Sequence, residues 1–172
     1  MTRVAVIGAG LAGLVVARRL QSVAHVTVFE KSRAAGGRMA TRYAGDYEFD
    51  HGAQFFTART ERFRSLLQPL IDDGAVADWQ ARFAEFDSRT MTALRSWGGN
   101  YPHYVGAPRM NRIGKLLSAD LNIAFETAIV AIARENHGWT LTDSGGSRSG
   151  PFDWVVLTAP APQTAALARD FP

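Results

Sequence analysis

The feature that most constrains this chain is a glycine-rich turn between a short apolar segment and a helical pattern near the N-terminus. Val4–Ile7 is an apolar run of the kind that a buried parallel strand uses. It stops at Gly8-Ala9-Gly10-Leu11-Ala12-Gly13, a complete G-x-G-x-x-G. From Gly13 onward, apolar residues recur at i, i+3, i+4 and i+7, as on one face of a helix. A strand, turn and helix in this order predict the first half of a dinucleotide-binding βαβ unit.

Each glycine of the turn has a physical role in such a unit. Gly8 permits the tight turn off the strand, Gly10 lets the backbone approach a pyrophosphate, and Gly13 lets the helix pack closely on the sheet. The phosphates would lie on the unpaired N–H groups of the helix start, which include those of Leu11 and Ala12, at the positive end of the helix dipole. We therefore predict that this turn holds the phosphates of a nucleotide.

An acidic residue follows the second apolar run. Val26–Phe29 ends in Glu30, at about the distance from the turn where the motif expects an acid for the ribose hydroxyls. A carboxylate there would repel a 2′-phosphate, so a nucleotide with free ribose hydroxyls is expected. The motif alone does not choose between NAD and FAD, and a glycine-rich turn in another α/β fold is the alternative.

Composition excludes several classes of protein. A chain of 172 residues with 47% hydrophobic residues is a globular domain, or one domain with a piece of another. The formal net charge is +3, and the charges are scattered without a basic stripe, so no nucleic-acid partner is expected. There are 0 cysteines, which excludes disulfides and thiolate metal sites and fits the cytoplasm, and no metal site is predicted. The apolar N-terminal stretch is too short to span a bilayer, so no membrane partner is expected.

The segment after Glu30 carries a resemblance to a known family. Lys31 and four further residues lead into Gly36-Gly37-Arg38-Met39. Together with the first turn, this run resembles the FAD-binding fingerprint of the flavin-containing amine oxidase superfamily. The resemblance implies FAD as the cofactor, with the Arg38 side chain and backbone amides holding the pyrophosphate opposite the helix. It implies cofactor contacts from Lys31, Gly37, Arg38 and Met39, whereas the alternative for Gly36–Arg38 is a surface turn.

The next motif narrows the resemblance. Asp50-His51-Gly52-Ala53-Gln54-Phe55-Phe56, after the G-G-R-M, resembles the renalase branch and its bacterial members, which are described as NAD/FAD-dependent oxidoreductases. The resemblance implies that Gly52, Ala53, Gln54 and Phe55 lie beside the flavin ring. His51 has either a catalytic role or, as is more common, a structural one. No other catalytic residue is assigned.

The middle of the chain has a different pattern. Thr60 is a candidate N-cap for a helix that ends before Gly74, and Pro69 is expected to kink or shorten that helix. Alternation over 77–83 predicts a single half-buried strand. Tyr104-Val105-Gly106-Ala107-Pro108 resembles a renalase segment that precedes a helix, although Arg109 stands where the family usually has glycine.

Strands dominate the C-terminal part. Runs at 123–126, 128–133, 139–142 and 153–158 predict strands, and Ser144–Gly150 predicts a flexible hairpin loop. By resemblance, Ile129 presents its backbone to adenine. The predicted fold is α/β: a Rossmann-like FAD/NAD(P)-binding domain of the glutathione-reductase type at 1–56 and 107–172, incomplete, with 57–106 as part of a mixed α+β substrate domain.

The resemblance also implies an activity. It implies an FAD-dependent oxidoreductase that moves a hydride from a small-molecule substrate, either a dihydronicotinamide or an amine, to FAD and then to oxygen. The alternative is an FAD/ADP-binding module or a truncated product without redox activity. Because the family continues past Pro172, we expect these residues to be an N-terminal portion with little turnover alone. The sequence does not indicate an oligomeric state.

Overall fold

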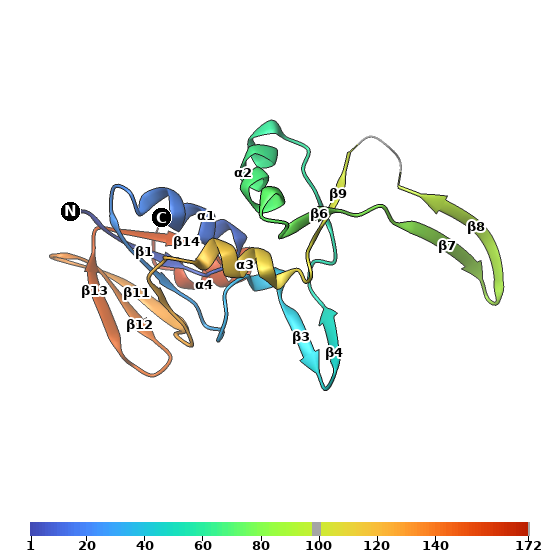
Figure 1. Cartoon of the computed structure of the whole chain (residues 1–172). Helices are drawn as coiled ribbons and strands as arrows, with labels where there is room; N and C mark the ends of the chain where they lie inside the picture. The colour runs from blue at the N-terminus through green and yellow to red at the C-terminus, as the bar shows by residue number, and fades with distance from the viewer. Residues whose placement is uncertain (98–100, 172) are drawn as a thin grey trace. The chain divides into compact units, whose positions relative to one another are not determined.

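The computed structural model describes residues 1–97 and 101–171, which form two compact units. Unit 1 comprises Met1–Ala40 and Gly114–Pro172, and unit 2 comprises Thr41–Ile113 (Figure 1). Within the described ranges, no helix has the length and apolar character needed to cross a membrane. The domain limits expected from sequence, with 57–106 as the insertion, stay a prediction.

Unit 1 is built on a four-stranded parallel sheet in the order β10-β2-β1-β14. The strands are β1 (Arg3–Ile7), β2 (His25–Phe29), β10 (Ile123–Ala124) and β14 (Trp154–Leu157). The helix α1 (Leu11–Leu20) packs against β1 and β2. Ile7 is paired with Phe29 on one side and with Leu157 on the other, so three strands end at the same level. The predicted α/β class and Rossmann-like unit are confirmed.

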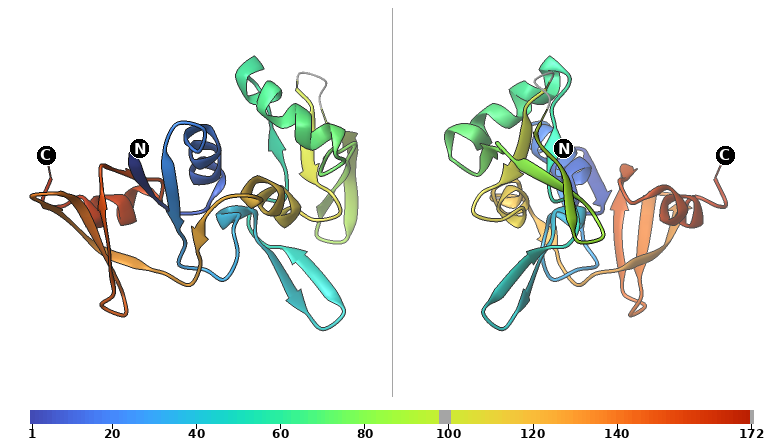
Figure 2. Two further views of the ribbon diagram at one scale, coloured as in Figure 1. Left: turned by 60° about the vertical axis from the view of Figure 1, so that its left-hand side comes forward. Right: turned by 90° about the vertical axis from the view of Figure 1, so that its right-hand side faces the viewer.

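An antiparallel sheet covers one face of the parallel sheet. It contains β11 (Ile129–Glu135), β12 (Gly138–Asp143) and β13 (Arg148–Phe152), and α4 (Ala161–Leu167) contacts β11 (Figure 2). Ala5 and Ile7 of β1 form one core cluster with side chains of the antiparallel sheet. Phe29 and Phe152 meet there edge to face, with ring centroids 5.9 Å apart. Val4 and Val6 alternate with these positions and point to the other face.

The predicted loop at 144–150 is shorter in the structure, because β13 begins at Arg148. Arg148 and Ser149 pair with Thr142 and Leu141 of β12, and Arg148 forms an ion pair with Glu135. The turn itself is closed by Asp143, whose carboxylate accepts the N–H groups of Gly145 and Ser147. Backbone pairing therefore forms a strand where the sequence has no apolar alternation.

Unit 2 contains two hairpins, a small sheet and a helix. One hairpin is β3 (Thr41–Ala44) with β4 (Tyr47–Asp50), and the other is β7 (Arg82–Asp87) with β8 (Thr90–Ser96). The sheet has the order β5-β9-β6, with β5 (Phe56–Thr57), β9 (His103–Gly106) and β6 (Val76–Asp78). The helix α2 (Glu61–Asp72) begins at the predicted cap, where the Thr60 hydroxyl accepts the Phe63 N–H. The helix α3 (Asn111–Ser118) begins in unit 2.

Two local expectations for this region are corrected by the structure. Pro69 lies inside α2, and the helix continues to Asp72 although proline has no N–H to donate to the preceding turn, so the expected shortening does not occur. The strand predicted over 77–83 is split between β6 and β7. The Ala81 N–H donates to the Trp79 carbonyl over 2.9 Å, and this tight turn interrupts the strand.

Candidate dinucleotide-binding site

The glycine-rich turn follows β1 directly in unit 1. Gly8 has φ +107°, a value that side chains rarely allow, and its N–H donates to the carbonyl of Phe29 at the end of β2. Gly10 is the N-cap residue of α1, and no side chain caps this helix start. The N–H groups of the first turn of α1 therefore have no partner within the helix and are available to an anion.

Gly10 and Gly13 differ in what surrounds them. A Cβ atom built on Gly13 would overlap the Gly8 carbonyl oxygen and lie 2.7 Å from the Thr158 hydroxyl. A Cβ atom on Gly10 would meet no atom of the described residues within 4 Å. Gly13 is thus required for packing inside the protein, whereas Gly10 faces open space. This is the arrangement expected if the backbone at Gly10 approaches a ligand.

The second glycine turn lies against the first, backbone to backbone. Gly10 and Gly36 form a parallel β-bridge, and the Gly36 N–H donates to the Ala9 carbonyl over 2.8 Å. A Cβ atom on Gly37 would lie 3.1 Å from the Gly10 Cα. The structure therefore brings together the two motifs that the sequence assigns to the pyrophosphate. We call this pair, Gly8–Gly13 and Gly36–Arg38, the glycine cradle.

Glu30 is the buried carboxylate of this region, with 6% of its surface exposed. Its Oε2 accepts the Ala9 N–H over 2.7 Å, and its Oε1 accepts the Ser32 N–H over 2.8 Å. Each carboxylate oxygen has a second lone pair, so hydroxyl donors of a ribose can still bind. The ribose contact of Glu30 stays a prediction.

The remaining predicted residues of unit 1 surround the cradle or lie near its ends. Arg38, in the 3-10 turn Gly37–Met39, is exposed and makes no hydrogen bond or ion pair with the described part of the chain. Met39 is buried, Lys31 and Ala12 are exposed, and Leu11 is half-buried. Ile129 begins β11 at a register shift and packs against the core cluster, and its adenine contact stays a prediction.

Sequence reasoning missed Thr158 as a part of this site. Its hydroxyl lies 2.9 Å from the Ile7 carbonyl oxygen and 3.0 Å from the Gly8 carbonyl oxygen, and it donates to both. The sequence indicated only that Thr158 ends a strand at 153–158, and the pairing of that strand with β1 comes from the structure. Thr158 therefore fixes the carbonyl against which Gly13 packs.

The predicted ring-facing residues Gly52, Ala53, Gln54 and Phe55 belong to unit 2 and have no regular secondary structure. Phe55 is 40% exposed and contacts the rings of Trp79, Trp97 and His103. His51 is exposed. The contact of residues 52–55 with the flavin ring stays a prediction.

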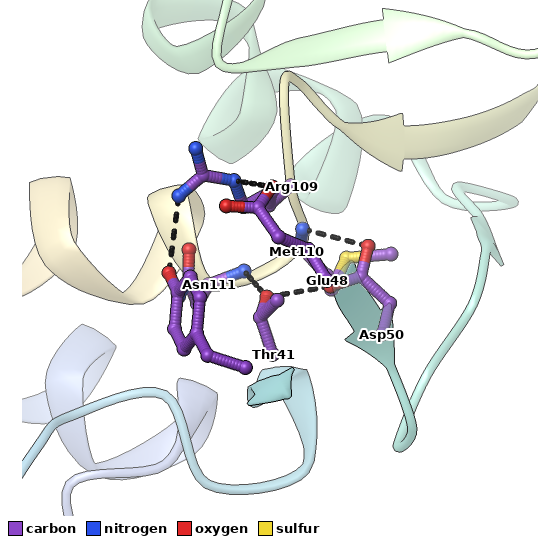
Figure 3. A network of polar contacts seen from close by, with 7 residues as sticks. Thr41, Glu48, Asp50, Arg109, Met110 and Asn111 are labelled. Atoms are coloured by element: carbon purple, nitrogen blue, oxygen red, sulfur yellow. Dashed lines mark hydrogen bonds and ion pairs between the residues drawn. The ribbon is translucent and has the colours of Figure 1, made fainter. Parts of the chain in front are cut away.

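The 51–55 segment is held at both of its ends by residues 103–111. At one end, Asp50 Oδ2 accepts the Met110 N–H over 3.1 Å (Figure 3). At the other end, Phe56 pairs with Tyr104 of β9. Thr41 completes the first attachment, because its hydroxyl donates to Asp50 Oδ1 over 2.5 Å and accepts the N–H of Asn111. The N–H groups at the start of α3 are thus capped by side chains from a distant hairpin.

Arg109, which stands where the family usually has glycine, contacts the β3–β4 hairpin. Its Nε forms an ion pair with Glu48 over 2.5 Å, and its Nη1 donates to the Tyr43 hydroxyl over 3.1 Å. The hydrogen bond with Tyr43, helped by the charge of Glu48, raises the pKa of Arg109 above its ordinary value, so the guanidinium stays charged. The side chain that replaces glycine thus adds a contact between the hairpin and the turn before α3.

Comparisons with known proteins agree with this geometry. A family model described as an NAD(P)-binding Rossmann-like domain matches residues 6–70. A 1-hydroxycarotenoid 3,4-desaturase of Flavobacterium sp. (strain P99-3) is 43% identical over 58 residues, which are 33% of this chain and 12% of that protein. A 4,4'-diapophytoene desaturase (4,4'-diaponeurosporene-forming) of Staphylococcus aureus (strain Newman) is 47% identical over 51 residues, 29% of this chain and 10% of that protein.

Solved structures resemble the chain over most of its length. A protein of Exiguobacterium sp. 255-15 assigned as a protoporphyrinogen oxidase matches with TM-score 0.71 and 15% identity, over 98% of this chain and 62% of its own. A CLA-producing fatty acid isomerase from P. acnes matches with TM-score 0.70 and 12% identity, over 96% of this chain and 60% of its own. At these identities the likeness shows the fold, and the chain spans less than two thirds of each of these proteins. The family model and the geometry together show that this chain contains a Rossmann-like unit.

The same substitution is expected to destabilise the protein much more at Gly13 than at Gly10. Gly13→Ala is expected to lower the free energy of unfolding by about 2 kcal/mol, because the added methyl group overpacks against the Gly8 carbonyl. Gly10→Ala, which adds the methyl group toward open space, is expected to cost about 1 kcal/mol or less. Urea unfolding of both variants measures this, and equal destabilisation would contradict the assigned surroundings.

The hairpin attachment predicts a graded effect at Asp50. Asp50→Ala leaves the Met110 N–H without an acceptor and is expected to cost about 1–3 kcal/mol of unfolding free energy. Asp50→Asn is expected to lower the free energy of unfolding by less, because the amide oxygen can accept the Met110 N–H and the amide nitrogen can donate to the Thr41 hydroxyl. Urea unfolding distinguishes the two, and an Asn variant as unstable as the Ala variant would show that this geometry is not the source of the stability.

Proposed function

We propose that this chain binds FAD and forms part of an FAD-dependent oxidoreductase that oxidises a dihydronicotinamide-like substrate or an amine, with oxygen as the final acceptor. The observation that carries the proposal is the glycine cradle, in which two turns meet at Gly10 beside the unpaired start of α1. When bound, FAD supplies the hydride acceptor, and the protein supplies binding and orientation.

The residues of unit 1 fit the adenine-diphosphate half of FAD. The open space at Gly10 accepts a pyrophosphate, and the N–H groups of the first turn of α1 favour its negative charge. The exposed guanidinium of Arg38 is free to pair with a phosphate oxygen. Glu30 has lone pairs left for the ribose, and Lys31 and Ile129 are proposed for the ribose and adenine.

Two observations favour redox chemistry over nucleotide binding alone. The sequence relatives are named desaturases and one solved neighbour is assigned as an oxidase, and both names denote redox reactions. The dihydronicotinamide or amine substrate is proposed from the resemblance of the segments at 36–39 and 50–56 to the renalase branch. The proposal includes a small-molecule partner, a cytoplasmic location, and no nucleic-acid or membrane partner.

A second candidate is an FAD- or ADP-binding module without redox activity. It is favoured by the distribution of the contacts, since the cradle and Glu30 address the phosphates and ribose rather than a reacting atom. In this case the protein would bind FAD, and no substrate would reduce it.

The two candidates are separated by reconstitution with FAD followed by visible spectroscopy. The proposal predicts that flavin absorbance co-elutes with the protein, and that a dihydronicotinamide isomer or an amine bleaches it without oxygen in a slow single turnover, with recovery in air. Binding without bleaching supports the module instead. A protein that retains no flavin contradicts both candidates.

The carboxylate of Glu30 predicts discrimination between nucleotides. ADP is expected to bind at least about fivefold more tightly than 2′-phospho-ADP, because two like charges a few ångströms apart cost about 1 kcal/mol even when solvated. Calorimetric titration with each nucleotide measures this difference, which should narrow as salt is added. Equal affinities at low salt would contradict the placement of the ribose at Glu30.

A further inference from the structure

Glu30 makes contacts that recognition of a ribose does not require. Its two carboxylate oxygens accept N–H groups from two different segments, Ala9 of the first glycine turn and Ser32 of the segment that leads to the second. The side chain is buried in the absence of any nucleotide, with 6% of its surface exposed. These bonds are charge-assisted, and such bonds are shorter and stronger than neutral ones.

Ala9 connects these contacts to the glycine cradle. Its N–H donates to Glu30, and its carbonyl accepts the Gly36 N–H over 2.8 Å. Ala9 itself is completely buried. The bond from Glu30 and the contact between the two turns therefore share one residue, so a shift of Ala9 would move Gly10 relative to Gly36.

The backbone of Glu30 is fixed as well. Its N–H donates to the Ala124 carbonyl over 2.9 Å, and its carbonyl accepts the Thr127 N–H over 2.9 Å. The carboxylate thus belongs to the residue that follows β2, whose backbone is bonded to Ala124 of the parallel strand β10 and to Thr127. Glu30 is thus a fixed point to which the first glycine turn and the segment before the second are bonded.

We propose that Glu30 is a positioning residue for the pyrophosphate, in addition to its proposed contact with the ribose. Its carboxylate holds Ala9 and Ser32 so that Gly10 and Gly37 keep the spacing that a pyrophosphate requires. The inference rests on the proposed nucleotide binding. It predicts that Glu30 matters for a nucleotide that has no ribose hydroxyls.

Charge and geometry act in opposite directions at this position, which makes a substitution informative. Glu30→Gln removes a negative charge from the region of the phosphates, and this alone would strengthen the binding of a diphosphate. The same substitution places an amide NH₂ against the N–H of Ala9 or Ser32, and a buried donor then lacks an acceptor. Weaker binding of a diphosphate by this variant would therefore show that the backbone at Ala9 or Ser32 is no longer held in place.

Asp153 offers a matched control in the same unit. Its Oδ2 accepts the Arg3 N–H over 2.7 Å, the same distance as in the bond from Ala9 to Glu30. Asp153→Asn makes the same change of charge just before β14, on a residue that the structure does not bond to either glycine turn. An effect confined to Glu30 therefore cannot come from net charge.

The experiment is calorimetric titration of the wild-type protein and both variants with ADP and with 2′,3′-dideoxy-ADP, after circular dichroism has confirmed folding. We expect Glu30→Gln to weaken dideoxy-ADP binding about tenfold and Asp153→Asn to leave it unchanged. If Glu30→Gln weakens ADP binding but leaves dideoxy-ADP binding equal or tighter, Glu30 acts only on the ribose and the inference is wrong. If the wild-type protein binds neither nucleotide, the proposed function fails and the inference fails with it.

A second measurement needs no variant. Amide hydrogen exchange of the unliganded wild-type protein should show strong protection at Ala9, whose N–H has a side-chain acceptor rather than a backbone one. Rapid exchange at Ala9, with slow exchange in β1, would show that the bond from Glu30 does not hold the turn and would overturn the inference.

Discussion

The contact on which unit 1 depends is the approach of two glycine turns, backbone to backbone, at Gly10 and Gly36. A Cβ atom on Gly10 would extend into open space where a ligand is expected, whereas Gly36 has φ +118°, a backbone conformation that side chains rarely adopt. The contact also concentrates unpaired N–H groups at one end of α1, where an anion is favoured. The binding function proposed for this chain follows from this contact.

Several neighbouring residues maintain that approach. Thr158 holds the carbonyl of Gly8 at the end of β14, and Glu30 holds Ala9 from the end of β2. From the other side, Gly114 packs so closely on Gly36 that a Cβ atom would lie 2.7 Å from the Gly36 Cα. The parallel sheet brings Thr158 and Glu30 to the same edge, because β14 and β2 end at the same level as β1. The fold thus places the ends of three parallel strands beside the two glycine turns.

The strand, turn and helix at 4–20 could be predicted from sequence because glycine spacing and apolar periodicity are local signals. The contact of Gly10 with Gly36 agrees with the motif. The bonds from Ala9 to Glu30 and from Thr158 to Gly8 could not be predicted, since they join residues far apart in the chain. The strand β13 was missed because backbone pairing, rather than apolar alternation, defines it. From the sequence, Arg109 was recognised only as a residue that stands where the family usually has glycine. Its contacts with Glu48 and Tyr43 are visible only in the tertiary structure.

The most direct test of the central claim is a titration of the isotopically labelled protein with ADP, followed through its backbone amide resonances. If the two turns form one pyrophosphate site, the amides of Gly10, Leu11 and Ala12 and those of Gly37 and Arg38 should shift together, with a common dissociation constant. Shifts confined to one turn, or confined to unit 2, would contradict the account.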